Sequence, residues 1–163
     1  MEHNSLEQEV ARLLLSLEIT IAVAESCTGG LICHRLTNMS GSSDYLERGV
    51  VAYSNRSKTE LLGISEQVIE EHGAVSEVCV RAMASGIRQL AGTDLGLSVS
   101  GIAGPTGGTS EKPVGTVYIA MAWNEDVQCW RHFFEGSRTE IKQQTSEEAL
   151  LRIREYCQSI QDE

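Results

Sequence analysis

The first apolar residues of the chain recur at helical spacing, which predicts an amphipathic helix over residues 5–17. Residues 19–24 follow as a short apolar run that is typical of a buried strand. A tight, glycine-bearing stretch then leads into another helical pattern. The residues that would share the core face of the first helix are Leu6, Val10, Leu13, Leu14 and Leu17.

The rest of the chain continues this alternation of helices and strands and then ends in two strands and a helix. Further helices are predicted at 29–37, at 57–62, at Ser65 with 68–72, at 76–90 and at 137–158. Further strands are predicted at 50–53, 95–100, 116–123 and 127–134, the last two forming an antiparallel hairpin around residues 124–126. This order predicts an α/β fold, a three-layer α/β/α sandwich on a mixed sheet of about five or more strands.

Length and charge narrow the function classes. The chain has 163 residues, enough for one domain over 1–163. The formal charge of −10 argues against DNA or RNA as a partner, because nucleic-acid binding needs clustered lysine and arginine. An acidic N-terminus without a long apolar run predicts a cytoplasmic protein that does not enter a membrane. Five cysteines without a paired spacing are expected to be free thiols, mostly buried.

The loop after the first strand carries a candidate nucleophile. Ser26 would lie on a strand-to-helix turn, and the N–H groups of Cys27, Thr28 and Gly29 would face a developing oxyanion at the helix N-terminus. Two other interpretations stay open. Ser26 or Thr28 could simply cap the helix, or the turn could cradle a phosphate without covalent chemistry.

Lys58 follows the second predicted strand and is the candidate base, because no histidine lies near Ser26 in the sequence. A lysine can act as a base if burial lowers its pKa by roughly 3 units from about 10.4. The alternative is an ordinary solvated lysine.

Two further segments could bind the substrate. The loop of residues 101–108 is rich in glycine and offers backbone N–H groups to an anionic or planar ligand. The alternative is a simple mobile connection, with residues 111–113 as its charged stem. Arg138, at the start of the last helix, could bind a phosphate or could be an exposed arginine near the helix cap.

Other chemistries find little support. The histidines at 3, 34, 72 and 132 lack metal-ligand spacing, which argues against zinc. The sequence contains neither a Walker A motif nor the dinucleotide fingerprint, which argues against ATP hydrolysis and classical NAD binding.

Five motifs occur together in this order along the chain: Ala24–Gly30, Gly49–Asn55 with Lys58, Gly73–Glu77, Ser100–Pro105 and Glu111–Val117. With them the chain resembles one protein family, the C-terminal domain of competence-damage-inducible protein A (CinA), from about residue 20 to residue 138. Stand-alone members of that family are nicotinamide-nucleotide amidohydrolases.

The resemblance implies a specific reaction, hydrolysis of the carboxamide of nicotinamide mononucleotide (NMN) to nicotinate mononucleotide and ammonia by a Ser/Lys dyad. By motif position the dyad is Ser26 and Lys58, and no metal or organic cofactor is needed. The resemblance also places other residues at the nucleotide, with Arg138 near its phosphate. These expected substrate-binding residues are Tyr53, Asn55, Gly101, Ile102, Ala103, Gly104 and Arg138.

Several expectations depend on the resemblance. Thr106 stands where many relatives have an acidic residue, which is expected to alter contacts to ribose or the anchoring of the loop. The chain is too short for the N-terminal domain of larger relatives, so the pyrophosphate hydrolysis linked to that domain should be absent. A nucleotide-binding accessory or regulatory module without turnover, or a hydrolase of another amide or nucleotide ester, are the alternatives. The terminal hairpin is compatible with a homo-oligomer.

Overall fold

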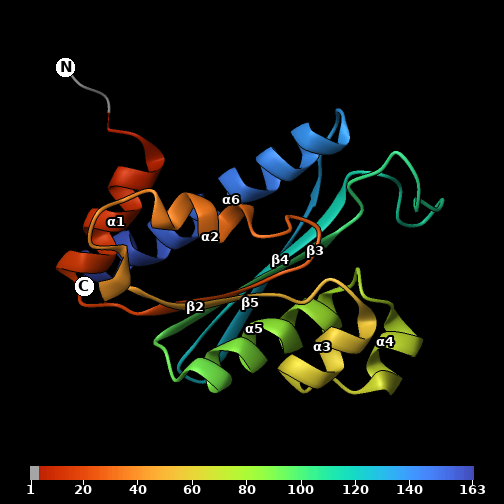
Figure 1. Ribbon diagram of the computed structural model, residues 1–163, viewed down its shortest axis with the longest axis horizontal. Helices are drawn as coiled ribbons and strands as arrows, with labels where there is room; N and C mark the ends of the chain where they lie inside the picture. Colours follow the sequence, from red (N-terminus) through yellow and green to blue (C-terminus); the bar gives the residue numbers. More distant parts are fainter. Residues whose placement is uncertain (1–3) are drawn as a thin grey trace.

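The computed structural model describes residues 4–163 as three layers, a five-stranded sheet with helices on both faces (Figure 1). The strands are β1 (Ile21–Glu25), β2 (Leu46–Val51), β3 (Leu95–Gly101), β4 (Thr116–Trp123) and β5 (Asp126–Phe133). The helices are α1 (Leu6–Ser16), α2 (Leu31–Thr37), α3 (Asn55–Leu62), α4 (Glu66–His72), α5 (Glu77–Ala91) and α6 (Arg138–Gln161). The predicted α/β/α sandwich on a mixed sheet is confirmed.

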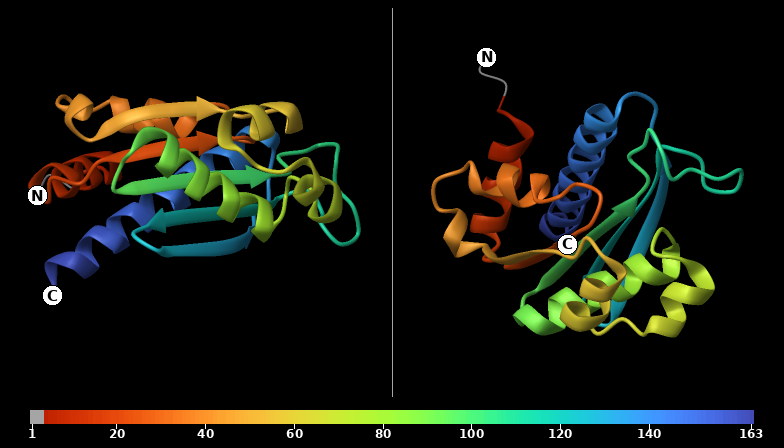
Figure 2. Two further views of the ribbon diagram at one scale, coloured as in Figure 1. Left: turned by 90° about the horizontal axis from the view of Figure 1, so that it is seen from below. Right: turned by 45° about the vertical axis from the view of Figure 1, so that its right-hand side comes forward.

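The sheet has the order β2-β1-β3-β4-β5, and its strands lie side by side in Figure 2. Strands β2, β1 and β3 are parallel, whereas β4 and β5 form the predicted antiparallel hairpin. The carboxyl ends of the three parallel strands therefore meet at one edge of the sheet, where the segments that follow them come together.

Each face of the sheet has its own apolar core. Helices α1, α2 and α6 cover one face, and α5 with α3 and α4 covers the other (Figure 1). Strands β1, β3 and β4 are buried along almost their whole length because helices pack on both sides of them. Each helix between residues 4 and 163 is either too short or too polar to cross a membrane.

Several predicted boundaries differ by two or more residues, among them the starts of β1 and α3 and the end of α6, and two of the differences have clear local reasons. The second strand runs from Leu46 to Val51 rather than over 50–53, because it is a partly exposed edge strand whose polar residues hide the apolar pattern. The helix predicted from Gly29 begins at Leu31, because Gly29 and Gly30 have φ values of 60° and 105°, in the left-handed region.

The homo-oligomer with which the terminal hairpin is compatible stays a prediction.

Gly96 marks a close approach between a helix and the sheet. A methyl group at this position of β3 would fall inside contact distance of the Ala84 carbonyl oxygen and 2.6 Å from the Arg88 Cβ, both in α5. The absence of a side chain lets α5 lie directly on β3.

We expect Gly96→Ala to lower the free energy of unfolding by about 3 kcal/mol, because the new methyl group must push α5 off the sheet. Gly92→Ala is the control: its φ of 66° strains an alanine, but no atom lies within 4 Å, so a loss of about 1 kcal/mol is expected. Urea denaturation of both variants tests this. Equal losses would contradict the packing argument.

Candidate active site

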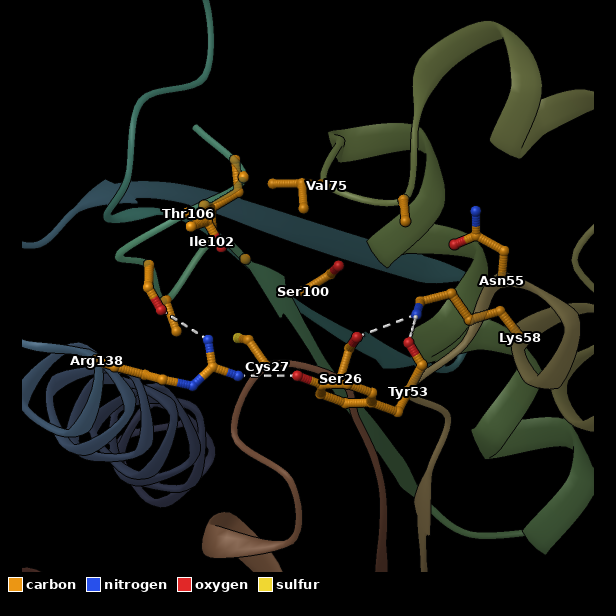
Figure 3. A pocket seen from close by; sticks show the side chains of 15 residues that line it. Ser26, Cys27, Tyr53, Asn55, Lys58, Val75, Ser100, Ile102, Thr106 and Arg138 are labelled. Carbon is orange, nitrogen blue, oxygen red and sulfur yellow. Dashed lines mark hydrogen bonds between the residues drawn. The ribbon is translucent and has the colours of Figure 1, made fainter. Parts of the chain in front are cut away.

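A pocket of about 270 Å³ opens at the carboxyl edge of the parallel strands. Ser26 follows β1, Lys58 lies in α3 after β2, and the glycine-rich loop follows β3, so each parallel strand delivers one candidate segment to it. Figure 3 shows how these side chains converge. The lining residues are Ser26, Cys27, Tyr53, Asn55, Lys58, Ala74, Val75, Ser100, Gly101, Ile102, Ala103, Gly104, Thr106, Gly107 and Arg138.

The side chains of Ser26 and Lys58 meet in this pocket. The Lys58 Nζ lies 3.0 Å from the Ser26 Oγ, and the two residues are 1% and 8% exposed (Figure 3). The carbonyl oxygens of Ala52 and Tyr53 accept hydrogen bonds from the same Nζ at 2.8 and 3.1 Å. An uncharged amine has two N–H groups and one lone pair, so two carbonyls can hold its N–H groups while the lone pair faces the serine hydroxyl.

Burial lowers the pKa of Lys58 from its usual value of 10.5. Negative charge on the neighbouring Cys79 and Cys27 would oppose this shift, but burial raises the pKa of both thiols, that of Cys27 to about 12. Both thiols therefore stay neutral near pH 7 and leave desolvation as the dominant effect on Lys58. The high pKa also makes Cys27 a poor nucleophile, although it adjoins Ser26.

The turn after Ser26 only partly matches the predicted oxyanion site. The Gly29 N–H donates to the Ser26 carbonyl oxygen at 3.1 Å, so Gly29 offers no free N–H group, and neither Thr28 nor Gly29 lines the pocket. Cys27 does line it, and its N–H has no acceptor within the described part of the chain. The N–H next to the nucleophile is thus the remaining donor of the predicted three.

The α2 N-terminus does not face the pocket with free donors either. The N–H groups of Ile32 and Cys33 donate to the Glu25 carboxylate at 2.9 and 3.1 Å. These two N–H groups are therefore unavailable to an oxyanion, because a buried carboxylate already accepts from them.

The glycine-rich loop forms a second wall of the pocket. The Ile102 N–H donates to Thr116 O at 2.9 Å and Ile102 O accepts from Gly115 N–H at 2.8 Å, which continues the β3–β4 pairing into the loop. Gly101, Ile102, Ala103 and Gly104, which were predicted to bind the substrate, all line the pocket. The outer part of the loop, residues 105–113, projects from the sheet (Figure 2), and Lys112 ties its stem to the His72 carbonyl oxygen at 3.0 Å.

Arg138 reaches into the site from the first turn of α6. Its Nη1 donates to Gly104 O at 2.7 Å and its Nη2 to the Tyr53 Oη at 2.9 Å (Figure 3). Both acceptors are uncharged, and within residues 4–163 no carboxylate pairs with this guanidinium. Its charge remains available to an anionic ligand.

The lining also contains residues to which the sequence assigned no role. Ala74 and Val75 come from the segment between α4 and α5, and Ser100 is the next-to-last residue of β3. Ala74 and Val75 belong to the family motif Gly73–Glu77, but the motif did not indicate what these two residues contact. Thr106 lies at the pocket rim near Val75 and Ile102 (Figure 3).

The fold and this site define a three-layer α/β domain that buries a serine–lysine pair at the carboxyl edge of its parallel strands. The family model described as the CinA C-terminal domain matches residues 3–157. The chain therefore belongs to the CinA family.

Individual relatives and solved structures agree with this assignment. The chain is 55% identical over 156 residues to a CinA-like protein of Syntrophus aciditrophicus, and 48% identical over 156 residues to one of Syntrophotalea carbinolica. These alignments cover 95% and 96% of this chain but only 37% and 38% of the relatives, so the chain spans less than half of their length.

Crystal structures of similar proteins have the same fold. The competence damage-inducible protein A of Klebsiella pneumoniae superposes with a TM-score of 0.89 at 36% identity, covering 92% of this chain and 93% of its own. The competence/damage inducible protein CihA of Agrobacterium tumefaciens gives 0.86 at 35% identity, covering 94% and 96%.

The lowered pKa of Lys58 predicts a pH-dependent stability. Between its folded-state pKa and 10.5, the unfolded chain binds more protons at Lys58 than the folded protein, so this residue makes stability rise with pH. Lys58→Met removes that contribution. The stability of the wild type relative to the variant should increase from about pH 7 to about pH 10. Urea denaturation at both pH values measures it, and a difference that stays constant or shrinks would contradict the burial argument.

Proposed function

We propose that this domain hydrolyses the carboxamide of NMN to nicotinate mononucleotide and ammonia, with Ser26 as nucleophile and Lys58 as general base. The observation that carries the proposal is the 3.0 Å approach of a buried lysine amine to a serine hydroxyl inside an open pocket. A serine needs such a base because its hydroxyl is a weak nucleophile at neutral pH. The family resemblance supports the choice of substrate.

The charge of the pocket supports an anionic substrate. Although the chain has a net charge of −10, the charged side chains that line the pocket are those of Lys58 and Arg138, and no aspartate or glutamate among residues 4–163 joins them. The Arg138 guanidinium has five N–H groups, and Gly104 O and Tyr53 Oη accept from two of them, so the others can donate to a phosphate. A nucleotide that carries a neutral amide at one end and a phosphate at the other fits this distribution.

The acylation step follows from the contacts of Lys58. Its neutral amine takes the Ser26 proton as the oxygen attacks the carboxamide carbon, which gives a tetrahedral intermediate. The ammonium formed then has three N–H donors, and Ser26 Oγ, Ala52 O and Tyr53 O are placed to accept them. The same three atoms therefore orient both protonation states of the lysine. The Cys27 N–H adjoins the nucleophile and is the donor that we assign to the developing oxyanion.

Collapse of the intermediate releases the product amine. Lys58 returns its proton to the departing nitrogen, so that ammonia leaves and an ester of Ser26 remains. Water then attacks this ester with Lys58 again taking a proton, which frees the carboxylic acid and restores the serine hydroxyl. The positive charge on the pyridine ring makes the carbonyl carbon electron-poor and favours both attacks.

Substitution of either dyad residue should abolish turnover. We expect Ser26→Ala and Lys58→Met to lower kcat at least about 10³-fold, because each removes a group that bonds to, or exchanges a proton with, the reacting atoms. Ser57→Ala is the control, since this serine lies beside Lys58 in α3 but does not line the pocket. Ammonia and nicotinate mononucleotide formation from NMN measure the rates.

Two results of this experiment would overturn the proposal. If the wild type binds NMN saturably without releasing ammonia, the domain is a nucleotide-binding module. If another amide or a nucleotide ester is hydrolysed in its place, the dyad stands and the substrate is wrong.

Substitution of Arg138 should separate phosphate recognition from chemistry. Loss of a charge-assisted hydrogen bond costs about 1.5–3 kcal/mol, so Arg138→Gln should raise KM for NMN about 10- to 100-fold. Nicotinamide riboside has the same carboxamide and ring charge but no phosphate, so its kcat/KM should hardly change. Arg56→Gln is the control, because Arg56 is exposed and paired with Glu60. Equal losses for both substrates would refute a phosphate contact.

A further inference from the structure

The side chain of Glu25, the last residue of β1, lies between the strand and α2. It is fully buried, and within residues 4–163 it has no lysine or arginine partner. Its Oε1 accepts from Thr28 Oγ1 at 2.6 Å and from the Ile32 N–H at 2.9 Å, and its Oε2 accepts from the Cys33 N–H at 3.1 Å. A buried carboxylate without a cation is tolerated here because donors and the positive end of α2 surround it.

This arrangement replaces an ordinary helix cap. The N-cap residue of α2 is Gly30, which is left-handed and has no side chain to accept from the helix N–H groups. The other capped helices use serine, as Ser54 does in α3 and Ser76 in α5. The cap of α2 is therefore the carboxylate of Glu25, the residue of β1 that directly precedes Ser26.

Backbone hydrogen bonds to both neighbouring strands hold the chain at Glu25 and Ser26. The Glu25 carbonyl oxygen accepts from the Ala52 N–H at 2.9 Å, and the Ser26 N–H donates to Val99 O at 3.1 Å. These backbone bonds fix where β1 ends. The direction in which the chain leaves Ser26 is fixed by the carboxylate, which joins the strand to Thr28 and to the first turn of α2.

We infer that Glu25 is the positioning residue of the dyad, which holds the Ser26 hydroxyl at the Lys58 amine by capping α2 from the strand. Glu25 does not line the pocket and does not contact Lys58. It acts through the turn. The inference rests on the proposed function for its kinetic readout, but the reactivity of Ser26 also tests it without any nucleotide.

Glu25→Gln keeps the shape of the side chain but places an NH₂ group where one carboxylate oxygen accepted a hydrogen bond. A donor then faces a donor, and the turn must shift. Because misplacement of a reacting group by about 1 Å costs on the order of 10²-fold, kcat for NMN should fall by about that factor while KM stays near its wild-type value. Phosphonylation of Ser26 by a fluorophosphonate probe, followed by mass spectrometry, should slow in parallel.

Tyr45→Phe is the matched control for lost stability. The Tyr45 hydroxyl is buried and donates to Leu36 O at 2.5 Å, near the other end of α2. Its removal costs the same helix a buried hydrogen bond far from Ser26, so the melting temperature should fall while kcat and the phosphonylation rate persist. Rates are measured where circular dichroism shows every variant folded.

Thr28→Val is the milder test if Glu25→Gln does not fold. It removes the 2.6 Å contact at nearly constant volume but leaves the two backbone donors of α2 on the carboxylate. A fall in kcat and in phosphonylation rate, smaller than expected for Glu25→Gln and absent in Tyr45→Phe, supports the inference.

The inference and the proposed function can fail separately. If the wild type does not hydrolyse NMN but its Ser26 reacts with the probe, the probe rates of the variants still decide the role of Glu25. Wild-type probe rates in a folded Glu25→Gln or Thr28→Val variant overturn it, and so does a loss in Tyr45→Phe equal to that in Glu25→Gln.

Discussion

The burial of the Lys58 amine, which has no carboxylate partner in the described part of the chain, is the constraint on which the rest of the site depends. Because β2 ends at Val51, the carbonyl oxygens of Ala52 and Tyr53 leave the sheet ladder and turn toward the Lys58 Nζ. The Ser54 cap starts α3 at Asn55 and thereby sets which face of this short helix points inward. Together these local features hold the Lys58 amine against the Ser26 hydroxyl.

The parallel half of the sheet turns this local arrangement into a site. Strands β2, β1 and β3 run in the same direction, so the lysine, the serine and the glycine-rich loop arrive at one edge from segments far apart in the sequence. The antiparallel hairpin contributes differently, since it anchors the return of the loop and leads into α6 with Arg138. The order of the elements therefore places the two cationic side chains on different walls of the pocket.

The sequence predicts the parts of this structure that follow from burial and short-range capping. Strands β1 and β3 are apolar because helices cover both of their faces, and Ser76 and Ser137 mark helix starts that the structure confirms. The edge strand β2 was misplaced because half of it meets solvent. The positive φ values of Gly29 and Gly30, and the contacts of Glu25 with α2, depend on how a strand and a helix are oriented in space, which no local pattern encodes. The residues alone offered Ser26 and Lys58 as candidates with bland alternatives left open, and the family motifs selected this pair.

The hydrogen bonds of Arg138 have a consequence for how fast and how selectively a ligand can enter. An arginine side chain that moves freely loses on the order of 2 kcal/mol of rotamer entropy when a ligand immobilises it. Here Gly104 O and Tyr53 Oη have already selected one orientation of the guanidinium. Most of that entropic loss was therefore incurred during folding, and an arriving anion meets a fixed charge. A rigid charge favours ligands whose anionic group and reacting group are separated by the distance between Arg138 and Ser26. The guanidinium would therefore contribute to selectivity for ligand length as well as to affinity.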